Sequence, residues 1–143
     1  MLSTIAVGTD GSATASVAVK AAAEMARRFG AKLVLLSASQ PSHDDHSVDP
    51  RTISEELEWA FSRDARVREL LYRTKEDLRE QNVDCTTMSD EGDPAEVLIR
   101  LAEECGADLL VIGNKGMHRR VLGSVPNTVT HKASCSVYVV KTS

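Results

Sequence analysis

The sequence predicts a single α/β domain in which a five-stranded parallel sheet carries helices on both faces, as in Rossmann-like folds. Short apolar runs alternate with longer amphipathic segments along all 143 residues, and this alternation is typical of parallel strands joined by helical crossovers. The apolar runs lack a regular polar–apolar alternation, as expected for strands buried on both faces. No repeat or linker divides the sequence, so 1–143 is expected to be one domain.

The first predicted unit is a strand, a helix and a second strand. The run "TIAVG" at 4–8 predicts a buried strand, after which Ser12 is expected to cap a helix that ends near Phe29. Apolar side chains fall on one stripe of that helix. Gly30 is typical of a helix C-terminus, and "AKLVLLSAS" at 31–39 predicts the second strand.

A polar segment at 40–51, "QPSHDDHSVDPR", predicts a loop. Its histidines, His43 and His46, stand beside aspartates, but nothing in the pattern fixes a ligand geometry. A solvated acidic loop is therefore favoured over a metal site. A long helix is expected at about 52–81, and "VDCTTMS" at 83–89 predicts a weaker third strand at a sheet edge.

The next helix has the clearest start in the sequence. Asp93 predicts its N-cap, Pro94 suits its first position, and Glu96 completes a capping box. Gly106 is expected to end the helix, and "ADLLVIG" at 107–113 predicts the most apolar strand.

A short helix and a fifth strand close the sequence. Ser124 is expected to cap a helix that runs to about Lys132, with Pro126 tolerated in its first turn. "CSVYVVKT" at 135–142 predicts the strand, and its side chains alternate between two apolar faces. An edge strand this apolar is expected to pair with a second copy rather than remain open.

Composition excludes several classes of function. Seventeen basic and 21 acidic residues give a formal charge of −4, which disfavours a general nucleic-acid surface. No basic leader or long apolar segment predicts secretion or membrane insertion, so a cytoplasmic protein is expected. The three cysteines, at 85, 105 and 135, form no CxxC pair and are expected to be reduced packing residues.

Two polar, glycine-rich loops follow strands of the predicted sheet: "VGTDGS" after the first and "IGNKG" after the fourth. In a parallel sheet, ligands bind beyond the carboxyl ends of the strands, where the winding direction reverses. If the two strands are neighbours, both loops open on one crevice. The sequence therefore predicts a ligand site there.

The residues of these loops suit a nucleotide. Gly123 and Ser124 stand where the last helix begins, and a helix N-terminus attracts phosphate through its free N–H groups. Asp10 suits a ribose hydroxyl or an adenine edge, because a carboxylate accepts hydrogen bonds. Neither the P-loop pattern nor GxGxxG is present, so a phosphate site is only slightly favoured over a structural turn. The basic run at 117–120 is equally compatible with a phosphate contact and with a solvated turn.

The segments "IAVGTDGS", "GDPAEVLIRLAEECGADLLVIGNKG" and "LGSVPNTVTHKASCSVYVVK" together resemble the universal stress protein family over nearly the whole chain. The resemblance implies a sheet in the order 3-2-1-4-5 and a dimer formed through the last strand. It also implies ATP as a ligand, because many members of that family bind ATP, although others lack the motif.

The phosphate motif of the ATP-binding members aligns with Gly113, Gly116, Gly123 and Ser124, but six residues separate the last two glycines here instead of nine. Ala38 falls where an adenine-contacting valine often stands. The nucleotide-binding residues that this alignment and the loops predict are Thr9, Asp10, Ala38, Ile112, Gly113, Gly116, Met117, Arg119, Gly123, Ser124 and Val125.

The predicted function is an adenine-nucleotide-binding sensor or regulator of a stress response, without a catalytic centre. ATP is the expected ligand, AMP and cyclic AMP are alternatives, and Mg²⁺ can accompany ATP. Protein partners are expected but not identified. The alternative is a nucleotide-free, dimeric interaction module whose shortened loop has lost the triphosphate. Slow ATP hydrolysis is a third, less favoured possibility, because no general base is evident.

Overall fold

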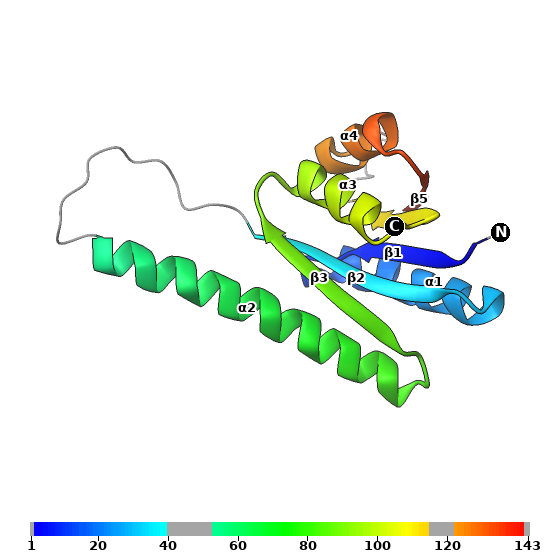
Figure 1. The fold of residues 1–143 in the computed structure, drawn as a ribbon, viewed down its shortest axis with the longest axis horizontal. Coiled ribbons are helices and arrows are strands. Elements are labelled where there is room, and N and C mark those ends of the chain that lie inside the picture. Colours follow the sequence, from blue (N-terminus) through cyan, green and yellow to red (C-terminus); the bar gives the residue numbers. More distant parts are fainter. Residues whose placement is uncertain (1, 40–52, 115–121, 142–143) are drawn as a thin grey trace.

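The computed structural model describes the backbone of residues 2–39, 53–114 and 122–141, and the side chains of the same residues apart from 53–63. Its core is a fully parallel sheet in the order β3-β2-β1-β4-β5, which confirms the predicted fold and strand order (Figure 1). The strands are β1 (Thr4–Gly8), β2 (Lys32–Ser39), β3 (Cys85–Glu91), β4 (Leu109–Gly113) and β5 (Ser136–Val140).

Helices cover both faces of this sheet. Those joining the strands are α1 (Ala13–Phe29), α2 (Ile53–Glu80), α3 (Pro94–Glu104) and α4 (Ser124–Lys132). Buried residues of α1 and α2 form one apolar cluster with one side of the sheet. Buried residues of α3 and α4 form a second cluster with the other side. The chain passes from β1 to β2 and β3 in one direction, and β4 then lies on the other side of β1, so the winding reverses between β1 and β4.

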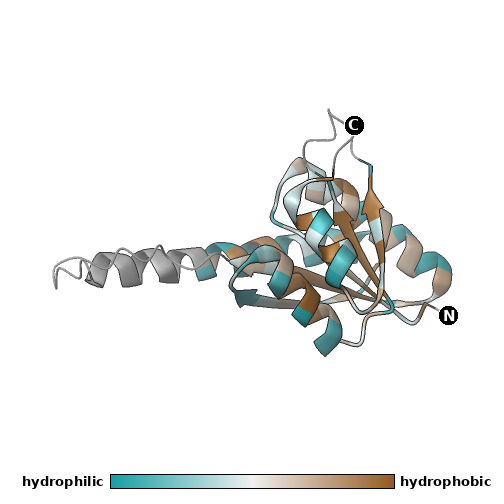
Figure 2. Ribbon diagram, turned by 90° about the horizontal axis from the view of Figure 1, so that it is seen from above, coloured by the Kyte–Doolittle hydropathy of each residue, from teal (hydrophilic) through white to brown (hydrophobic). Residues whose placement is uncertain are grey.

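Strand β1 lies at the centre of the molecule and contributes to both clusters. Ile5 and Val7 face α1, whereas Ala6 faces α3, and none of the three has an exposed side chain. Figure 2 shows the same distribution, with the hydrophobic colour concentrated on the central strands and on the inner faces of the helices. Burial of both faces explains why the sequence of β1 lacks alternation.

Three predicted helix boundaries are confirmed. Ser12 caps α1, and its Oγ accepts a hydrogen bond from the N–H of Ala15 (3.1 Å). Asp93 caps α3, where its Oδ2 accepts from the N–H of Glu96 (3.2 Å) and Pro94 takes the first position. Gly30 follows α1 in the left-handed conformation, with φ of 63°.

Four strands begin later than the sequence predicts, and three of them share a feature at their start. One or two residues ahead of β2, β3 and β4, a backbone N–H still donates to the last turn of the preceding helix. These bonds run from Ala31 N to Ala26 O, from Val83 N to Leu78 O and from Ala107 N to Ala102 O, each at 2.9 Å. A residue bonded to a helix carbonyl in this way cannot yet join a strand ladder.

Other boundaries also differ from the sequence prediction. Strand β3 continues past 89, because Asp90 and Glu91 pair with Ala38 and Ser39 of β2. Strand β5 spans five residues, because β4 is its only neighbour among the described strands and the ladder ends where Gly113 pairs with Val140. The predicted cap of α4 is wrong: Gly123 is the N-cap, and Ser124 is the first helical residue.

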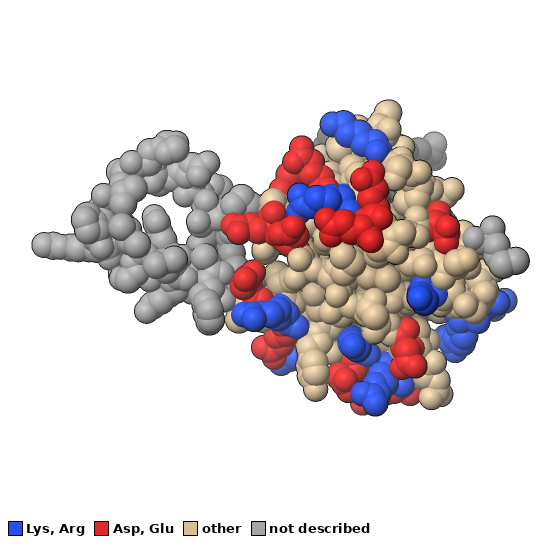
Figure 3. Space-filling model, in the orientation of Figure 1, with Lys and Arg blue, Asp and Glu red and all other residues tan. Residues whose placement is uncertain are grey.

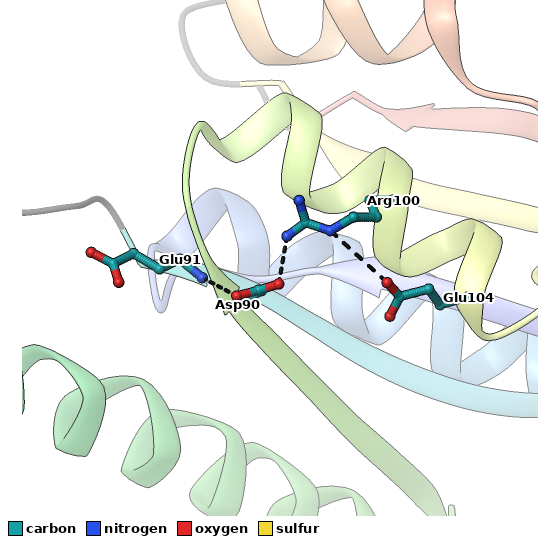
Figure 4. A network of polar contacts seen from close by, with 4 residues as sticks. All are labelled: Asp90, Glu91, Arg100 and Glu104. Atoms are coloured by element: carbon teal, nitrogen blue, oxygen red, sulfur yellow. Dashed lines mark hydrogen bonds and ion pairs between the residues drawn. The ribbon is translucent and has the colours of Figure 1, made fainter.

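The two edges of the sheet differ in chemistry. Most side chains of β3 are exposed and polar, and the face of the molecule in Figure 3 shows acidic side chains gathered around basic ones. Arg100 of α3 forms ion pairs with Asp90 of β3 and with Glu104, and Oδ1 of Asp90 accepts the N–H of Glu91 (2.7 Å) (Figure 4). This network connects the end of β3 to α3. At the opposite edge, the exposed side chain of Tyr138 and the half-buried Val137 and Val139 give β5 an apolar character.

None of the described helices is long and apolar enough to cross a membrane.

Candidate functional site

A cavity of about 460 Å³ opens at the carboxyl ends of β1 and β4, where the winding of the sheet reverses. The starts of α1, α3 and α4 complete its wall. Its volume falls within the range of small-molecule sites. The described residues that line it are Gly8, Thr9, Asp10, Ser12, Thr14, Ala15, Ala38, Pro94, Leu98, Ile112, Gly113, Gly123, Ser124, Val125 and Pro126.

The turn between β1 and α1 is held by its own side chains. Oδ1 of Asp10 accepts the N–H of Ser12 (2.9 Å), and Oγ1 of Thr9 accepts the N–H of Gly11 (3.3 Å). Thr9 is buried, and its N–H continues the sheet by donating to the Leu36 carbonyl (2.8 Å). The Asp10 side chain is therefore fixed at the cavity while it stays exposed to solvent.

The end of β4 approaches α1 closely. A Cβ atom on Gly113 would lie 2.7 Å from Cγ2 of Thr14 and 2.8 Å from the Thr14 carbonyl oxygen. Real Cβ atoms essentially never come so near to a neighbouring atom, so this position requires glycine. Gly113 therefore lets the wall of the cavity close between β4 and the first turn of α1.

Beyond Gly113, Asn114 reaches across to the start of α4. Its side chain is fully buried, and its Oδ1 accepts the N–H of Gly123 (2.8 Å). Gly123 makes no side-chain capping bond of its own, and its carbonyl accepts the N–H of Asn127 (3.0 Å). The first turn of α4 is thus fixed to the end of β4 by a side chain from outside the helix.

The cavity wall combines one negative charge with the N-terminus of α4. Among its described residues, Asp10 is the only charged one. At the N-terminus of α4, Ser124 and Val125 present backbone N–H groups, while Pro126 has none. Apolar contacts come from Ala38, Leu98, Ile112 and other residues. Such a surface can accept from hydroxyl or amino groups at Asp10 and donate to an anion at α4.

The cavity brings together most of the residues predicted from the sequence. The predicted residues that line it are Thr9, Asp10, Ala38, Ile112, Gly113, Gly123, Ser124 and Val125. The other three, Gly116, Met117 and Arg119, lie outside the described residues, as does the rest of the basic run at 117–120.

Sequence reasoning missed several lining residues that helices contribute, among them Thr14, Pro94 and Leu98. Leu98 belongs to the core face of α3 and also reaches the cavity. Thr14 carries no motif, and only its position in the first turn of α1 could have indicated its place. The role of Asn114 was also missed, because its partner Gly123 is nine positions away.

No second chemical centre emerges among the described residues. The two histidines of the acidic loop, His43 and His46, lie outside them, and within them no group of three or more His, Cys, Asp or Glu could hold a metal ion. All three cysteines are free thiols. Cys85 is buried in the core beside α1 and α2, and burial raises the pKa of its thiol. Burial likewise raises the pKa of Cys105 and of Cys135.

Comparison with known proteins gives the same picture as the fold. A family model described as the universal stress protein family matches residues 1–141. Universal stress protein Rv1636 of Mycobacterium tuberculosis is 37% identical over 145 aligned positions, which cover 97% of this chain and 96% of that protein. Universal stress protein YxiE of Bacillus subtilis is 26% identical over 150 positions and is covered completely.

Solved structures of universal stress proteins also match nearly the whole chain. The crystal structure of a universal stress protein in complex with cAMP has a TM-score of 0.75 at 31% identity, and the match covers 99% of both chains. The universal stress protein UspA from Lactobacillus plantarum has a TM-score of 0.82 at 23% identity, with 97% of both chains covered, and shares the fold. The chain belongs to the universal stress protein family.

Proposed function

We propose that the cavity between β1, β4 and α4 binds an adenine nucleotide and that the protein acts as a nucleotide-responsive regulator. The observation that carries this proposal is the convergence of the Asp10 turn and the α4 N-terminus on one cavity at the switch point of the sheet. The 31% identical structure that contains cAMP supports an adenine nucleotide as the ligand class.

The two ends of the cavity suit the two ends of a nucleotide. The Asp10 carboxylate accepts from ribose hydroxyls or the adenine amino group, and Ala38 and Leu98 offer apolar surface to the base. The N–H groups of Ser124 and Val125, at the positive end of the α4 dipole, donate to phosphate. The Ser124 hydroxyl adds a donor, because it is not used as the helix cap.

The number of phosphates distinguishes the candidate ligands. ATP is the ligand that the family resemblance implies, and Mg²⁺ would accompany it. The described wall supplies donors for about one phosphoryl group and no cation, so AMP and cyclic AMP need fewer contacts than ATP. Binding of ATP would draw on the residues at 115–121, which include Lys115 and two arginines.

Calorimetric titration with ATP, ADP, AMP, cyclic AMP and GMP tests the proposal. We expect saturable binding of at least one adenine nucleotide and much weaker binding of GMP. The proposal would be contradicted if no adenine nucleotide gave either heat or a thermal shift at about millimolar concentration. A Kd of about 1 mM corresponds to a binding free energy of roughly 4 kcal/mol. That result would favour the alternative of a nucleotide-free interaction module.

The proposed role is binding without catalysis. Among the described cavity residues, Asp10 is the only titratable side chain, and its Oδ1 already accepts from Ser12. His131, on α4, directs its Nδ1 to the Asn127 carbonyl (2.7 Å). A phosphate-release assay with ATP checks this point. Turnover that disappears on replacement of Asp10 would identify a hydrolase instead.

We also propose a homodimer formed through β5. Among the described strands β5 has a partner on one side only, and Tyr138 leaves 44% of its surface exposed. Pairing of two β5 strands about a two-fold axis would satisfy their outer backbone groups and bury their apolar side chains.

A further inference from the structure

The side chain of Asn114 is the most unusual polar group near the cavity. It is fully buried at the end of β4, where an apolar residue would be the simpler choice. Burial of an amide is costly unless it makes hydrogen bonds. Its Oδ1 accepts the N–H of Gly123 across nine positions of sequence, at 2.8 Å. This bond therefore fixes two ends of the cavity wall, Gly113 and Gly123, relative to each other.

The same bond determines which groups of α4 face the cavity. A helix begins with N–H groups that have no partner within the helix. Asn114 satisfies the N–H of Gly123, and Pro126 has no N–H, so Ser124 and Val125 carry the remaining donors of the first turn. Among the described residues, neither N–H of these two has an acceptor. Because Gly123 occupies the N-cap, the Ser124 hydroxyl is also not engaged as a cap.

We propose that Asn114 is the positioning residue for the phosphate-binding end of the nucleotide site. Its hydrogen bond to Gly123 holds the Ser124 and Val125 amides at a fixed distance from Gly113. The inference rests on the proposed nucleotide function. Hydrogen-bond donors in binding sites must be held to within about 0.5 Å to be effective. Loss of the Asn114 acceptor would release the start of α4 from β4 and misalign those amides.

A positioning role differs measurably from a role in stability alone. Adenosine has no phosphate and should depend on Asp10 and the apolar wall, whereas AMP should depend also on α4. A merely stabilising residue would affect both ligands equally. A hydrogen bond to a charged group corresponds to about tenfold to a hundredfold in affinity, so misalignment of the amides should appear as a selective loss of AMP binding.

The test compares the wild type with Asn114→Leu, which keeps the number and branching of the side-chain heavy atoms and removes the acceptor. We expect the Kd for AMP to rise about tenfold or more, while that for adenosine changes less than about threefold. Asn127→Ala removes an amide from an exposed position of α4 and should change neither. Asn114→Ser, whose side chain is one atom shorter, replaces the leucine variant if that variant fails to fold.

Amide exchange of Gly123 without nucleotide gives an independent readout. In the wild type the Gly123 N–H should be protected from exchange. In Asn114→Leu it should exchange about tenfold faster than neighbouring amides whose protection in the wild type is the same. Equal losses of AMP and adenosine affinity, or no loss of either, would overturn the positioning role. Failure of the wild type to bind any adenine compound would instead overturn the nucleotide function, and the positioning role with it.

Discussion

Gly113 and Thr14 lie against each other at the junction of β4 and α1, with only 2.7 Å between Cγ2 of Thr14 and the place where a Gly113 side chain would begin. We expect Gly113→Ala to lower the free energy of unfolding by about 1–3 kcal/mol, as overpacking of a close contact does. Urea unfolding monitored by circular dichroism measures this. The variant should also bind nucleotide more weakly, because Gly113 lines the cavity.

Thr14→Ser provides the matched control for that prediction. It removes the Cγ2 methyl group but leaves the Thr14 carbonyl, which would lie 2.8 Å from the new Cβ. The double variant should therefore recover part of the stability that Gly113→Ala loses, but not all of it. A Gly113→Ala protein as stable as the wild type would show that the backbone adjusts freely here.

The N-cap of α3 offers a second prediction. Oδ2 of Asp93 accepts from the N–H of Glu96 (3.2 Å), and loss of such a cap costs about 0.5–2 kcal/mol. Asp93→Ala should therefore lower the free energy of unfolding by about 1 kcal/mol, as measured by thermal or urea denaturation. Asp93→Ser keeps a capping oxygen and should remain close to the wild type. Equal loss in both variants would mean that the aspartate acts through its charge.

The acid sensitivity of the fold should depend on Asp108. Its Oδ2 accepts the N–H groups of Thr4 and Ser3, each at 2.9 Å, and these bonds lower the pKa of the carboxyl group. The stabilisation they give is present above the unfolded pKa of about 3.9 and is lost as the pH falls through the lower native pKa. Asp108→Asn should thus be less stable near neutral pH and lose less stability on acidification.

Urea midpoints measured from about pH 6 down to pH 2, across the unfolded pKa of aspartate, check this expectation. Asp84→Asn, which removes the same charge from an exposed residue at the start of β3, serves as the comparison. Its acid profile should run parallel to that of the wild type. If the acid profile of Asp108→Asn also ran parallel to that of the wild type, the two N–H contacts would not lower the pKa of Asp108 in the native state relative to the unfolded state.

The proposed dimer makes Val139→Lys informative. Val139 is half-buried on β5 and packs against the cluster formed by α3 and α4. In a β5-mediated dimer the substitution brings two like charges to one seam, so sedimentation should show a shift from dimer to monomer. Lys132→Ala, on the exposed end of α4, should leave the assembly unchanged. A wild type that sediments as a monomer of 15.5 kDa at about tens of micromolar would overturn the dimer. A Kd in that concentration range corresponds to a binding free energy of about 6 kcal/mol.

Local signals in the sequence predicted the fold because most of its elements carry their own start and stop residues. Strand β1 was predicted to the residue, and the caps at Ser12 and Asp93 were correct, since each cap bonds to an N–H three residues ahead. The strand starts were less accurate, because helix C-terminal bonds such as that from Val83 to Leu78 delay them. These bonds depend on backbone geometry rather than on residue type.

The site was predicted only as far as local motifs extend. Gly113 and Asp10 follow strands and could be placed from topology. Thr14 and Leu98 could not, because their position at the cavity depends on how α1 and α3 pack on the sheet. The cap of α4 was mispredicted for a similar reason. The N–H of its N-cap, Gly123, is accepted by the side chain of Asn114, and no pattern in the helix sequence indicates that contact.

The unequal edges of the sheet limit how large an assembly can grow. Strand β3 ends in charged and polar side chains that oppose further pairing, whereas β5 has an apolar face and an outer row of backbone groups that no described strand pairs with. In the language of polymer chemistry, such a protein is a monofunctional unit: one edge of its sheet can pair and the other edge is blocked. Monofunctional units terminate after a single coupling, so the proposed β5 pairing would end at a pair, and the polar β3 edge would prevent a fibre.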